Sequence, residues 1–263
     1  MTDYWLPITF IFMADILTRR NTVLEALRGS RRELHQLWLQ EGLDKKTHNV
    51  FVQAARGRRV PVQTASKQKL GQLAQDGRHQ GVALEVGAYP YSSVDEILGV
   101  AERREERPFL LLLDLLHGPQ NIGSLLRTAE ICGVHGVVVQ DRRAPEITPA
   151  VVQYSSGAAE HLHIAQVTNL VSTMRQLQTA GIWVVGMDLA EDARSLEEVD
   201  LNIPIAIVVG HEGDGLRRLV GKSCDYLLQL PMRGHVESLN AAVAGSILLY
   251  AAWQARGFVG KRP

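Results

Sequence analysis

The sequence predicts an α/β protein in which a small N-terminal domain precedes a larger domain built around a parallel sheet. Continuous apolar runs of strand length recur in the C-terminal part, and stretches with helical periodicity alternate with them. Strands that are apolar on both faces are typical of a parallel sheet covered by helices. The length of 263 residues also leaves room for two domains, because domains cluster near about 100 to 150 residues.

Short alternating elements predict the N-terminal domain, which we assign to residues 1–90. The apolar spacing indicates a short helix over residues 21–27 and strands over residues 35–39 and 79–87. Together these elements indicate a small α/β domain.

The first residues of the chain are apolar from position 4 to position 13. This run is far below the about 20 residues that span a bilayer, so we expect no membrane anchor. Because a well-patterned segment starts at Met13, we expect residues 1–12 to reflect an upstream start codon.

A charged segment that ends in Pro108 separates the two domains, and we expect residues 91–108 to form a linker or a solvated helix. The larger domain then covers residues 109–263. Its predicted strands are residues 109–116, 136–139, 183–187 and 205–210, and a helical pattern covers residues 170–180.

Charge is distributed unevenly along the chain, although the net charge is zero. Between Asp15 and Gln80 there are thirteen Lys and Arg residues against six acids, so the rest of the chain carries minus seven. A basic module joined to an acidic one suits a polyanion held at one end and chemistry done at the other. A solvated surface would carry the same charges, and charge alone leaves both interpretations open.

Two cysteines and a pair of histidines are the candidates for metal or redox chemistry. Cys132 and Cys224 belong to no C-x-x-C pair, so we expect reduced, buried thiols in a cytoplasmic protein. His161 and His163 would share one face of a strand, but no further ligand at metal spacing accompanies them. We therefore predict no metal, and the absence of G-x-S-x-G and G-x-x-x-x-G-K-[ST] motifs disfavours hydrolases and NTPases.

Three loops that follow predicted strands are rich in Gly or polar residues, and the ligand crevice of an open parallel sheet lies at such strand ends. The first loop, residues 117–123, contains Asn121 and leads into a helix that carries Arg127. Gly123 lets the backbone turn tightly, and Arg127 presents a planar fork suited to phosphate. A helix-capping Asn121 and a surface Arg127 are the structural alternative.

The second loop, residues 210–216, has three glycines directly after a strand. Its pattern is G-x-x-G-x-G and not G-x-G-x-x-G, which disfavours a dinucleotide site. Glu212 beside such a backbone is suited to hold a ligand amine or to orient a catalytic group. A strand-to-helix turn made of small residues is the alternative.

The third loop lies in the stretch LPMRGHVESLNAAVA, residues 230–244. We expect residues 230–232 to end a strand and Ser238 to be the N-cap of the helix that follows. Capping explains Ser238 but leaves Asn240, in the first turn of so apolar a helix, unexplained.

Taken together, the three loops resemble the motifs of the SpoU-TrmH family of RNA ribose 2′-O-methyltransferases. The matching motifs are N-x-G-x-x-x-R from Asn121, G-x-E-G-x-G from Gly210 and P-M-x-G-x-x-x-S-L-N from Pro231. Each motif is modest alone, and their order and spacing make the match specific. The N-terminal segments RRNTVLEAL and HQGVA resemble the substrate-binding module of the RlmB-type branch, which methylates a guanosine of 23S ribosomal RNA.

This resemblance implies a SPOUT-class fold with a deep trefoil knot, which binds the methyl donor S-adenosylmethionine in a bent form. It also implies a homodimer with its active site at the subunit interface, and RNA, here 23S ribosomal RNA, as the partner. Positions that match catalytic or RNA-contacting residues of the family are Asn121, Arg127, Glu212, Ser238 and Asn240. Positions that match donor-binding residues are Gly210, Gly215, Leu230, Met232 and Leu239.

One departure from the family pattern precedes Asn121, where the family often has Asp-Pro and this chain has His117-Gly118-Pro119-Gln120. The substitution removes a carboxylate, and with it any role assigned to that position.

Arg127 resembles the base that has been proposed for the family, yet a guanidinium with a pKa above about 12 is a poor base. We therefore expect Arg127 to clamp an RNA phosphate and to stabilise the developing alkoxide. Two alternative functions stay open: a transfer-RNA ribose methyltransferase of the same family, or a non-catalytic protein that binds RNA or assists ribosome assembly.

Overall fold

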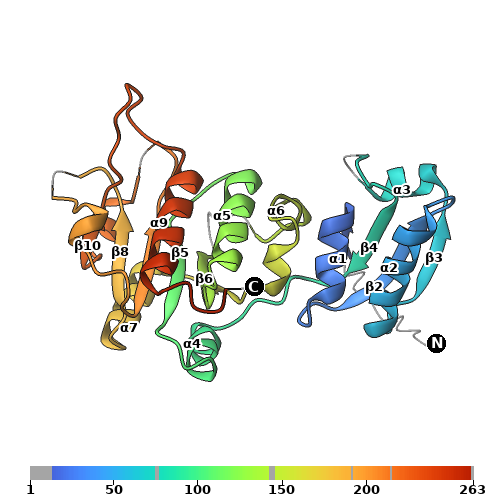
Figure 1. The fold of residues 1–263 in the computed structure, drawn as a ribbon, viewed down its shortest axis with the longest axis horizontal. Coiled ribbons are helices and arrows are strands. Elements are labelled where there is room, and N and C mark those ends of the chain that lie inside the picture. The colour runs from blue at the N-terminus through green and yellow to red at the C-terminus, as the bar shows by residue number, and fades with distance from the viewer. Residues whose placement is uncertain (1–13, 75–76, 142–145, 191, 214, 262–263) are drawn as a thin grey trace, which may run out of the picture.

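The computed structural model describes residues 14–74, 77–141, 146–190, 192–213 and 215–261. It has a small α/β part formed by the N-terminal residues and a larger part built on a second sheet, and the two lie side by side (Figure 1). The expectation about residues 1–12 lies outside the described residues.

The N-terminal part contains four strands and three helices among its described residues. These are β1 (Asp15–Thr18), α1 (Arg20–Arg28), β2 (Leu34–Gln40), α2 (Lys45–Gly57), β3 (Val62–Ala65), α3 (Lys67–Leu73) and β4 (Val82–Val86). The strand order is β1-β4-β2-β3, with β2 and β3 parallel and the other pairs antiparallel. Buried Leu37 and Leu84 of the sheet share one cluster with Leu27 of α1 and Phe51 of α2. The predicted helix over residues 21–27 and the predicted strands over residues 35–39 and 79–87 are confirmed as α1, β2 and β4.

The larger sheet is entirely parallel. Its strands are β5 (Phe109–Leu113), β6 (Gly136–Gln140), β7 (Ile164–Val167), β8 (Trp183–Met187), β9 (Ile205–Val209) and β10 (Tyr226–Leu228). They follow the order β10-β8-β9-β5-β6-β7. Every residue of β5 and β9 is buried, because helices cover both faces of the sheet. The apolar runs thus predict these strands correctly, although β5 ends at Leu113, three residues earlier than expected.

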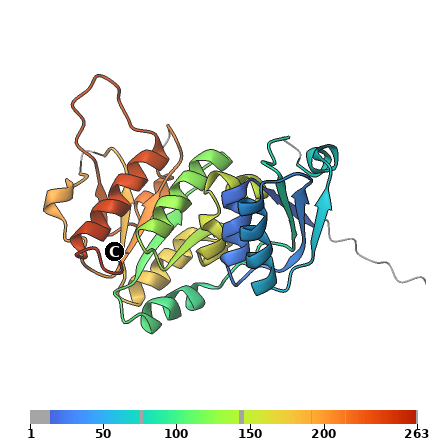
Figure 2. The same ribbon diagram turned by 45° about the vertical axis from the view of Figure 1, so that its right-hand side comes forward.

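Helices from both faces complete the core of the larger part. They are α4 (Val94–Arg103), α5 (Pro119–Ile131), α6 (Pro149–Tyr154), η1 (Ala158–His161), α7 (Leu170–Thr179), η2 (Leu196–Glu198), α8 (Arg218–Gly221) and α9 (Ala241–Ala255). Leu111 of β5 shares a cluster with Leu125 of α5 and Leu248 of α9. Leu112, its neighbour on the strand, belongs to the opposite cluster with Met174 of α7. The alternation of side chains along β5 therefore divides the core into two layers, and α5 and α9 lie next to each other on one of them (Figure 2).

The segment between the two parts contains α4. Ser93 and Glu96 form a capping box at its start, and Ile97, Val100 and Ala101 are buried on one face. Ile97 packs into the cluster that contains Leu112. Residues 94–103 therefore form a helix with one face packed on the sheet, while the linker over residues 91–108 and the domain bounds on either side of it stay predictions.

The C-terminal connection runs from β10, at one edge of the sheet, through a loop that projects beyond the helices, and back to α9 beside α5 (Figures 1 and 2). The trefoil knot stays a prediction. None of the helices in the described part of the chain is long and apolar enough to cross a membrane.

Candidate active site

Three loops meet at the carboxyl ends of the strands β5, β9 and β10, where an open parallel sheet offers a ligand crevice. The loop after β5 leads into α5, the loop after β9 contains Glu212, and the third loop joins β10 to α9. The helix α5 begins at Pro119, so Asn121 lies in its first turn and not in the expected loop. Proline fits this position because the first helical residues have no intrahelical acceptor for an N–H group.

A carboxylate held by two carboxamides is the central polar feature of these loops. Asn240 Nδ2 donates a hydrogen bond to Glu212 Oε1 at 2.7 Å, and Asn121 Nδ2 donates to Glu212 Oε2 at 2.8 Å. Asn240 Nδ2 also donates a hydrogen bond to Asn121 Oδ1 at 3.1 Å. Three of the predicted catalytic residues, each from a different motif, therefore form one hydrogen-bonded cluster.

Asn240 is the N-cap of α9, and this position explains how its side chain reaches Glu212. Asn240 Oδ1 accepts from the backbone N–H groups of Ala242 at 3.0 Å and Val243 at 3.2 Å. With the oxygen engaged at the helix, the amide nitrogen points away from it and toward the carboxylate. The prediction that Ser238 is the N-cap is therefore wrong, since α9 begins at Ala241, and residues 230–232 follow β10 as a loop and do not end a strand.

A cavity of about 260 Å³ opens beside this cluster. All five predicted donor-binding residues line it: Gly210, Gly215, Leu230, Met232 and Leu239. Glu212 and Ser238 line it as well. The structure thus brings the second and third motifs together around one hollow.

Two glycines of the cavity wall are required by close contacts. A Cβ on Gly210 would lie 2.3 Å from the carbonyl oxygen of Gly215, and one on Gly215 would lie 2.7 Å from Asp188 Oδ1. Gly215 also has a φ of 68°, and its N–H donates to the His211 carbonyl at 3.2 Å. A side chain at either position would therefore displace the wall of the cavity.

Asp188 is a site residue that the motifs did not indicate. It follows β8 and lines the cavity, where its carboxylate accepts from the N–H of Leu189 at 2.8 Å and of Leu216 at 3.3 Å. A carboxylate directly after a predicted strand was the signal in the sequence that could have found it.

The wholly buried Asp114 fixes the loop after β5 to the loop after β9. Its Oδ1 accepts from Arg217 Nε at 2.6 Å and its Oδ2 from the Arg217 backbone N–H at 2.9 Å. Arg217 Nη2 donates in turn to Gln140 Oε1 at 2.7 Å. These contacts hold the two loops in register below the cluster around Glu212.

Arg127 lies apart from the cavity within this chain. It extends from α5, is exposed, and donates from Nη1 to Ser156 Oγ at 3.3 Å, and it is not a lining residue of the cavity. The structure of one chain therefore does not bring Arg127 to the cluster of Glu212, Asn121 and Asn240.

His117, at the point where the chain departs from the family pattern, contacts His211 of the second loop. The two ring centroids are 5.3 Å apart at an interplanar angle of 74°. His211 lines the cavity, so this edge-to-face pair marks its rim.

The predicted histidine pair does not form a metal site. His161 belongs to η1 and lies 2.8 Å from Glu25, whereas Nδ1 of His163 lies 3.0 Å from Ser92 Oγ. Their placement on one strand is wrong, because the turn at Gly157, with a φ of 90°, starts a 3-10 helix. In the described part of the chain no three His, Cys, Asp or Glu residues are grouped for a metal ion.

The two cysteines are free thiols. Burial raises the pKa of Cys132 to about 11. Burial, together with Asp225 and two further carboxylates, raises the pKa of Cys224 to about 12. Both side chains are therefore protonated near neutral pH and are poor nucleophiles.

The basic excess of the N-terminal part is smaller on its surface than in its sequence. The side chain of Arg32 is 1% exposed and is paired with Glu160 and Asp15. Arg31 donates to the carbonyls of Leu162 and Pro90. These two arginines therefore make contacts within the protein and contribute less to a positively charged surface.

Comparison with known families identifies the chain. The model of the SpoU rRNA methylase family matches residues 108–250, and the model described as RNA 2′-O ribose methyltransferase substrate binding matches residues 20–92. The fold and the site thus define an RNA methyltransferase of the SPOUT class. The chain belongs to the SpoU-TrmH family.

Relatives and solved structures agree with this assignment. YacO of Bacillus subtilis (strain 168), whose name places it in the TrmH family of tRNA/rRNA methyltransferases, is 42% identical over 94% of this chain and 98% of its own length. A relative of the same family from Staphylococcus haemolyticus is 39% identical over 94% of this chain and 99% of its own. The crystal structure of the SpoU methyltransferase AviRb from Streptomyces viridochromogenes is 26% identical, with a TM-score of 0.76, over 93% of this chain and 90% of its own.

Proposed function

We propose that the protein transfers a methyl group from S-adenosylmethionine to a ribose 2′-hydroxyl of RNA, with a guanosine of 23S ribosomal RNA as the target. The observation that carries this proposal is the cluster in which Asn121 and Asn240 hold Glu212 at the edge of a glycine-walled cavity. AviRb, which shares the fold, has also been crystallised with this cofactor.

The cavity suits the methyl donor in shape and charge. The backbone of Gly210 and Gly215 permits close approach, and Leu230, Met232 and Leu239 supply apolar walls for an adenine ring. Asp188 and Glu212 line the same hollow, and a donor with a sulfonium and an ammonium group carries the charge complementary to these two acidic residues.

When bound, S-adenosylmethionine supplies an electrophilic methyl group. The residues of the chain then have two tasks: to align the ribose oxygen with that methyl group, and to stabilise the developing alkoxide as the hydroxyl passes its proton to solvent with the assistance of the RNA phosphate. Asn121, Asn240 and Glu212 are tied to one another, and alignment of this kind can supply about 7 to 11 kcal/mol. Ser238 lines the cavity as well, and we expect its hydroxyl to contact the ribose. The guanidinium of Arg127 clamps the RNA phosphate and stabilises the developing alkoxide.

A second copy of the chain is needed to bring an Arg127 to the cavity, and we therefore propose a homodimer with the active site at its interface. A groove between α5 and α9 is lined by Ser124, Thr128 and the exposed apolar residues Val243, Ile247 and Tyr250. An apolar helix face of this kind, continuous with Asn121 and Asn240, suits a self-association surface.

The N-terminal part is the proposed RNA-binding module, because it matches the substrate-binding model and carries the excess of basic residues. Transfer RNA is the second candidate substrate, since the names of the relatives cover tRNA and rRNA alike. We place the protein in the cytoplasm, in accordance with its free thiols.

Mapping ribose methylations in ribosomal and transfer RNA from a deletion strain tests the substrate. Loss of one mark in 23S ribosomal RNA is the expected result. Loss of a mark in transfer RNA would assign the second candidate, and unchanged marks in both pools would favour a non-catalytic RNA-binding protein.

A further inference from the structure

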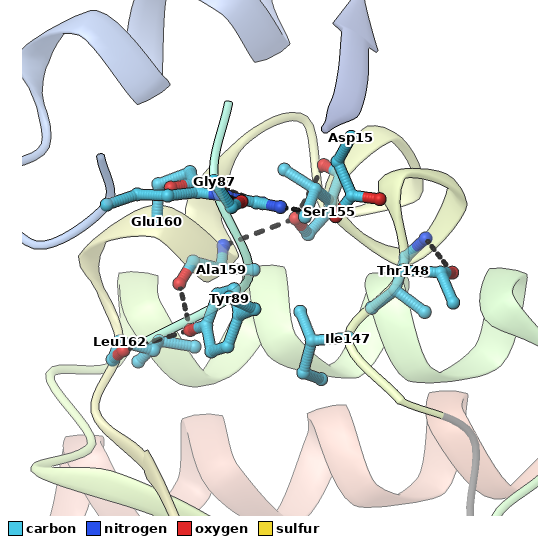
Figure 3. A network of polar contacts seen from close by, with 12 residues as sticks. Asp15, Gly87, Tyr89, Ile147, Thr148, Ser155, Ala159, Glu160 and Leu162 are labelled. Carbon is cyan, nitrogen blue, oxygen red and sulfur yellow. Dashed lines mark hydrogen bonds and ion pairs between the residues drawn. The ribbon is translucent and has the colours of Figure 1, made fainter. Parts of the chain in front are cut away.

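The segment of residues 154–161, which follows α6 and includes η1, lies between the catalytic helix α5 and the N-terminal part (Figure 3). We infer that this segment positions Arg127 relative to the RNA-binding module, and that Ser156 is the positioning residue. The inference rests on the proposed function, in which Arg127 belongs to the active site.

On its catalytic side, the segment fits closely against α5. A Cβ on Gly123 would lie 2.5 Å from Cβ of Tyr154 and 2.8 Å from the backbone nitrogen of Ser155, so the glycine of the first motif is required by this contact. One turn further along α5, Arg127 donates to Ser156 Oγ at 3.3 Å. The segment therefore contacts α5 where Arg127 leaves it.

The backbone of Ser156 adds to this assignment. Its φ is 55°, a left-handed conformation that glycine adopts more readily than serine. The stability of the turn alone would be served better by glycine, whereas the contact to Arg127 needs the hydroxyl.

On its other side, the segment is tied to the N-terminal part by a buried ion pair. Arg32 Nη1 lies 3.0 Å from Glu160 Oε1, and both side chains are at most 2% exposed. Arg32 Nη2 lies 2.5 Å from Asp15 Oδ2, and its Nε donates to the Gly87 carbonyl at 2.8 Å (Figure 3). Because Arg32 bridges Asp15 of β1 and Glu160 of η1, separation of the two parts would leave the carboxylate of Glu160 buried without its ion-pair partner, so the pair favours one relative position of the two parts.

Further contacts reinforce the connection. The Tyr89 hydroxyl donates to the carbonyl of Ala159 at 2.6 Å (Figure 3), and His161 lies 2.8 Å from Glu25 of α1. A Cβ on Gly157 would lie 2.6 Å from Cβ of Glu25. The segment is thus held on both sides, and a displacement of the N-terminal part relative to the sheet would move Ser156.

The consequence concerns substrate alignment. The contacts of Arg32 with Glu160 and of Ser156 with Arg127 therefore fix the position of Arg127 relative to RNA that is bound by the N-terminal part. Ser156 acts through Arg127 and touches neither donor nor cavity, so its loss should lower kcat and leave the affinity for S-adenosylmethionine unchanged.

A matched pair of substitutions at one position tests this inference. Ser156→Ala and Ser156→Gly both remove the hydroxyl, but glycine relieves the left-handed backbone and alanine does not. We expect both variants to lose kcat by about 10-fold or more, with the glycine variant at least as thermally stable as the wild type. Ser156→Asn, which tolerates a positive φ and offers a side-chain oxygen, should recover part of the rate.

Single-turnover methyl transfer to RNA, together with calorimetric titration of S-adenosylmethionine, provides the readout. Wild-type kcat in both the alanine and glycine variants would overturn the inference. A loss of rate in the alanine variant alone would also overturn it, because that pattern follows backbone strain. If the wild-type protein transferred no methyl group to any RNA, the proposed function would fail instead, so the two failures are distinguishable.

Glu160→Gln tests the other end of the path. We expect this variant to bind S-adenosylmethionine like the wild type, to show a broader distribution of distances between labels on the two parts, and to lose kcat. A broadened distribution with wild-type kcat would contradict the coupling.

Discussion

Asn240 joins two structural tasks in one side chain: its oxygen caps α9 and its nitrogen donates to Glu212 at 2.7 Å. The apolar helix α9 thus begins where the polar cluster of the site ends. This arrangement accounts for the residue that the sequence left unexplained.

The two tasks of Asn240 can be separated by substitution. Asn240→Ser keeps an N-cap oxygen and loses the donor to Glu212, whereas Asn240→Ala loses both. We expect both variants to lose kcat by about 10- to 100-fold, and only the alanine variant to lose about 1 kcal/mol of unfolding free energy. Denaturant unfolding and methyl-transfer assays measure the two effects, and a serine variant with wild-type rate would exclude a catalytic role for the bridge to Glu212.

Gly210 is predicted to be essential for donor binding. A Cβ at this position would lie 2.3 Å from the Gly215 carbonyl oxygen, so Gly210→Ala must distort the cavity wall. We expect its Kd for S-adenosylmethionine to rise by about 10-fold or more, which corresponds to about 1.4 kcal/mol. Gly71→Ala on α3 is the matched control, because a Cβ there meets nothing within 4 Å and the position does not line the cavity. Calorimetric titration should find the control unchanged, and an equally unchanged Gly210→Ala would argue against the cavity as the donor site.

The groove between α5 and α9 is predicted to be the dimer interface. Ile247 on α9 is 42% exposed in the single chain, and Ile247→Arg would place a charge in the apolar face. We expect this variant to be monomeric by light scattering and inactive in methyl transfer. Its cavity should stay folded and should bind S-adenosylmethionine with the affinity of the wild type. Leu219→Arg, at a side chain that is 71% exposed on α8, should stay dimeric and active. A wild-type protein that is monomeric at assay concentration, yet active, would contradict the shared active site.

His135 is predicted to make stability depend on pH. Its Nδ1 accepts from the Phe109 N–H at 3.0 Å, and Nε2 lies 3.1 Å from Glu106, so the ring is neutral. Burial lowers the pKa of His135, and Arg104 and Arg256 lower it further against the opposing effect of Glu106.

The sign of this dependence follows from proton binding. Below about pH 6.5, the ordinary pKa of histidine, the unfolded chain takes up a proton that the folded protein excludes. The contribution of neutral His135 to the free energy of unfolding is therefore complete above that pH. It is lost as the pH falls through the lowered pKa of the folded protein. Urea unfolding between pH 7.5 and 5 should give a smaller loss for His135→Asn, which keeps an acceptor, than for the wild type. Parallel pH profiles for the two proteins would refute this account.

Much of the fold could be predicted from the sequence, because the strands of the larger part are buried on both faces. The runs at β5, β8 and β9 have the length and the continuous apolar character of buried strands, and the loop with Gly210 and Glu212 follows the last of them. The residues of the polar cluster were therefore found from their motifs.

What the sequence could not supply depends on contacts between distant segments. Ser238 and Asn240 are both good N-caps, and the choice between them is made by Glu212, 28 residues away from Asn240. In the sequence, Arg32 is one of the thirteen basic residues that suggest a surface for a polyanion. In the structure it is buried against Glu160, 128 residues further along the chain. The separation of Arg127 from the cavity likewise follows from the face of α5 on which it lies.

Transfer of a labelled methyl group from S-adenosylmethionine to 23S ribosomal RNA, followed by identification of the modified nucleoside, tests both the reaction and its target. We expect a single ribose 2′-O-methylated guanosine with the wild-type protein and a slower transfer with Asn240→Ser. A label on a nucleobase, or transfer that is equally fast in the variant, would contradict it.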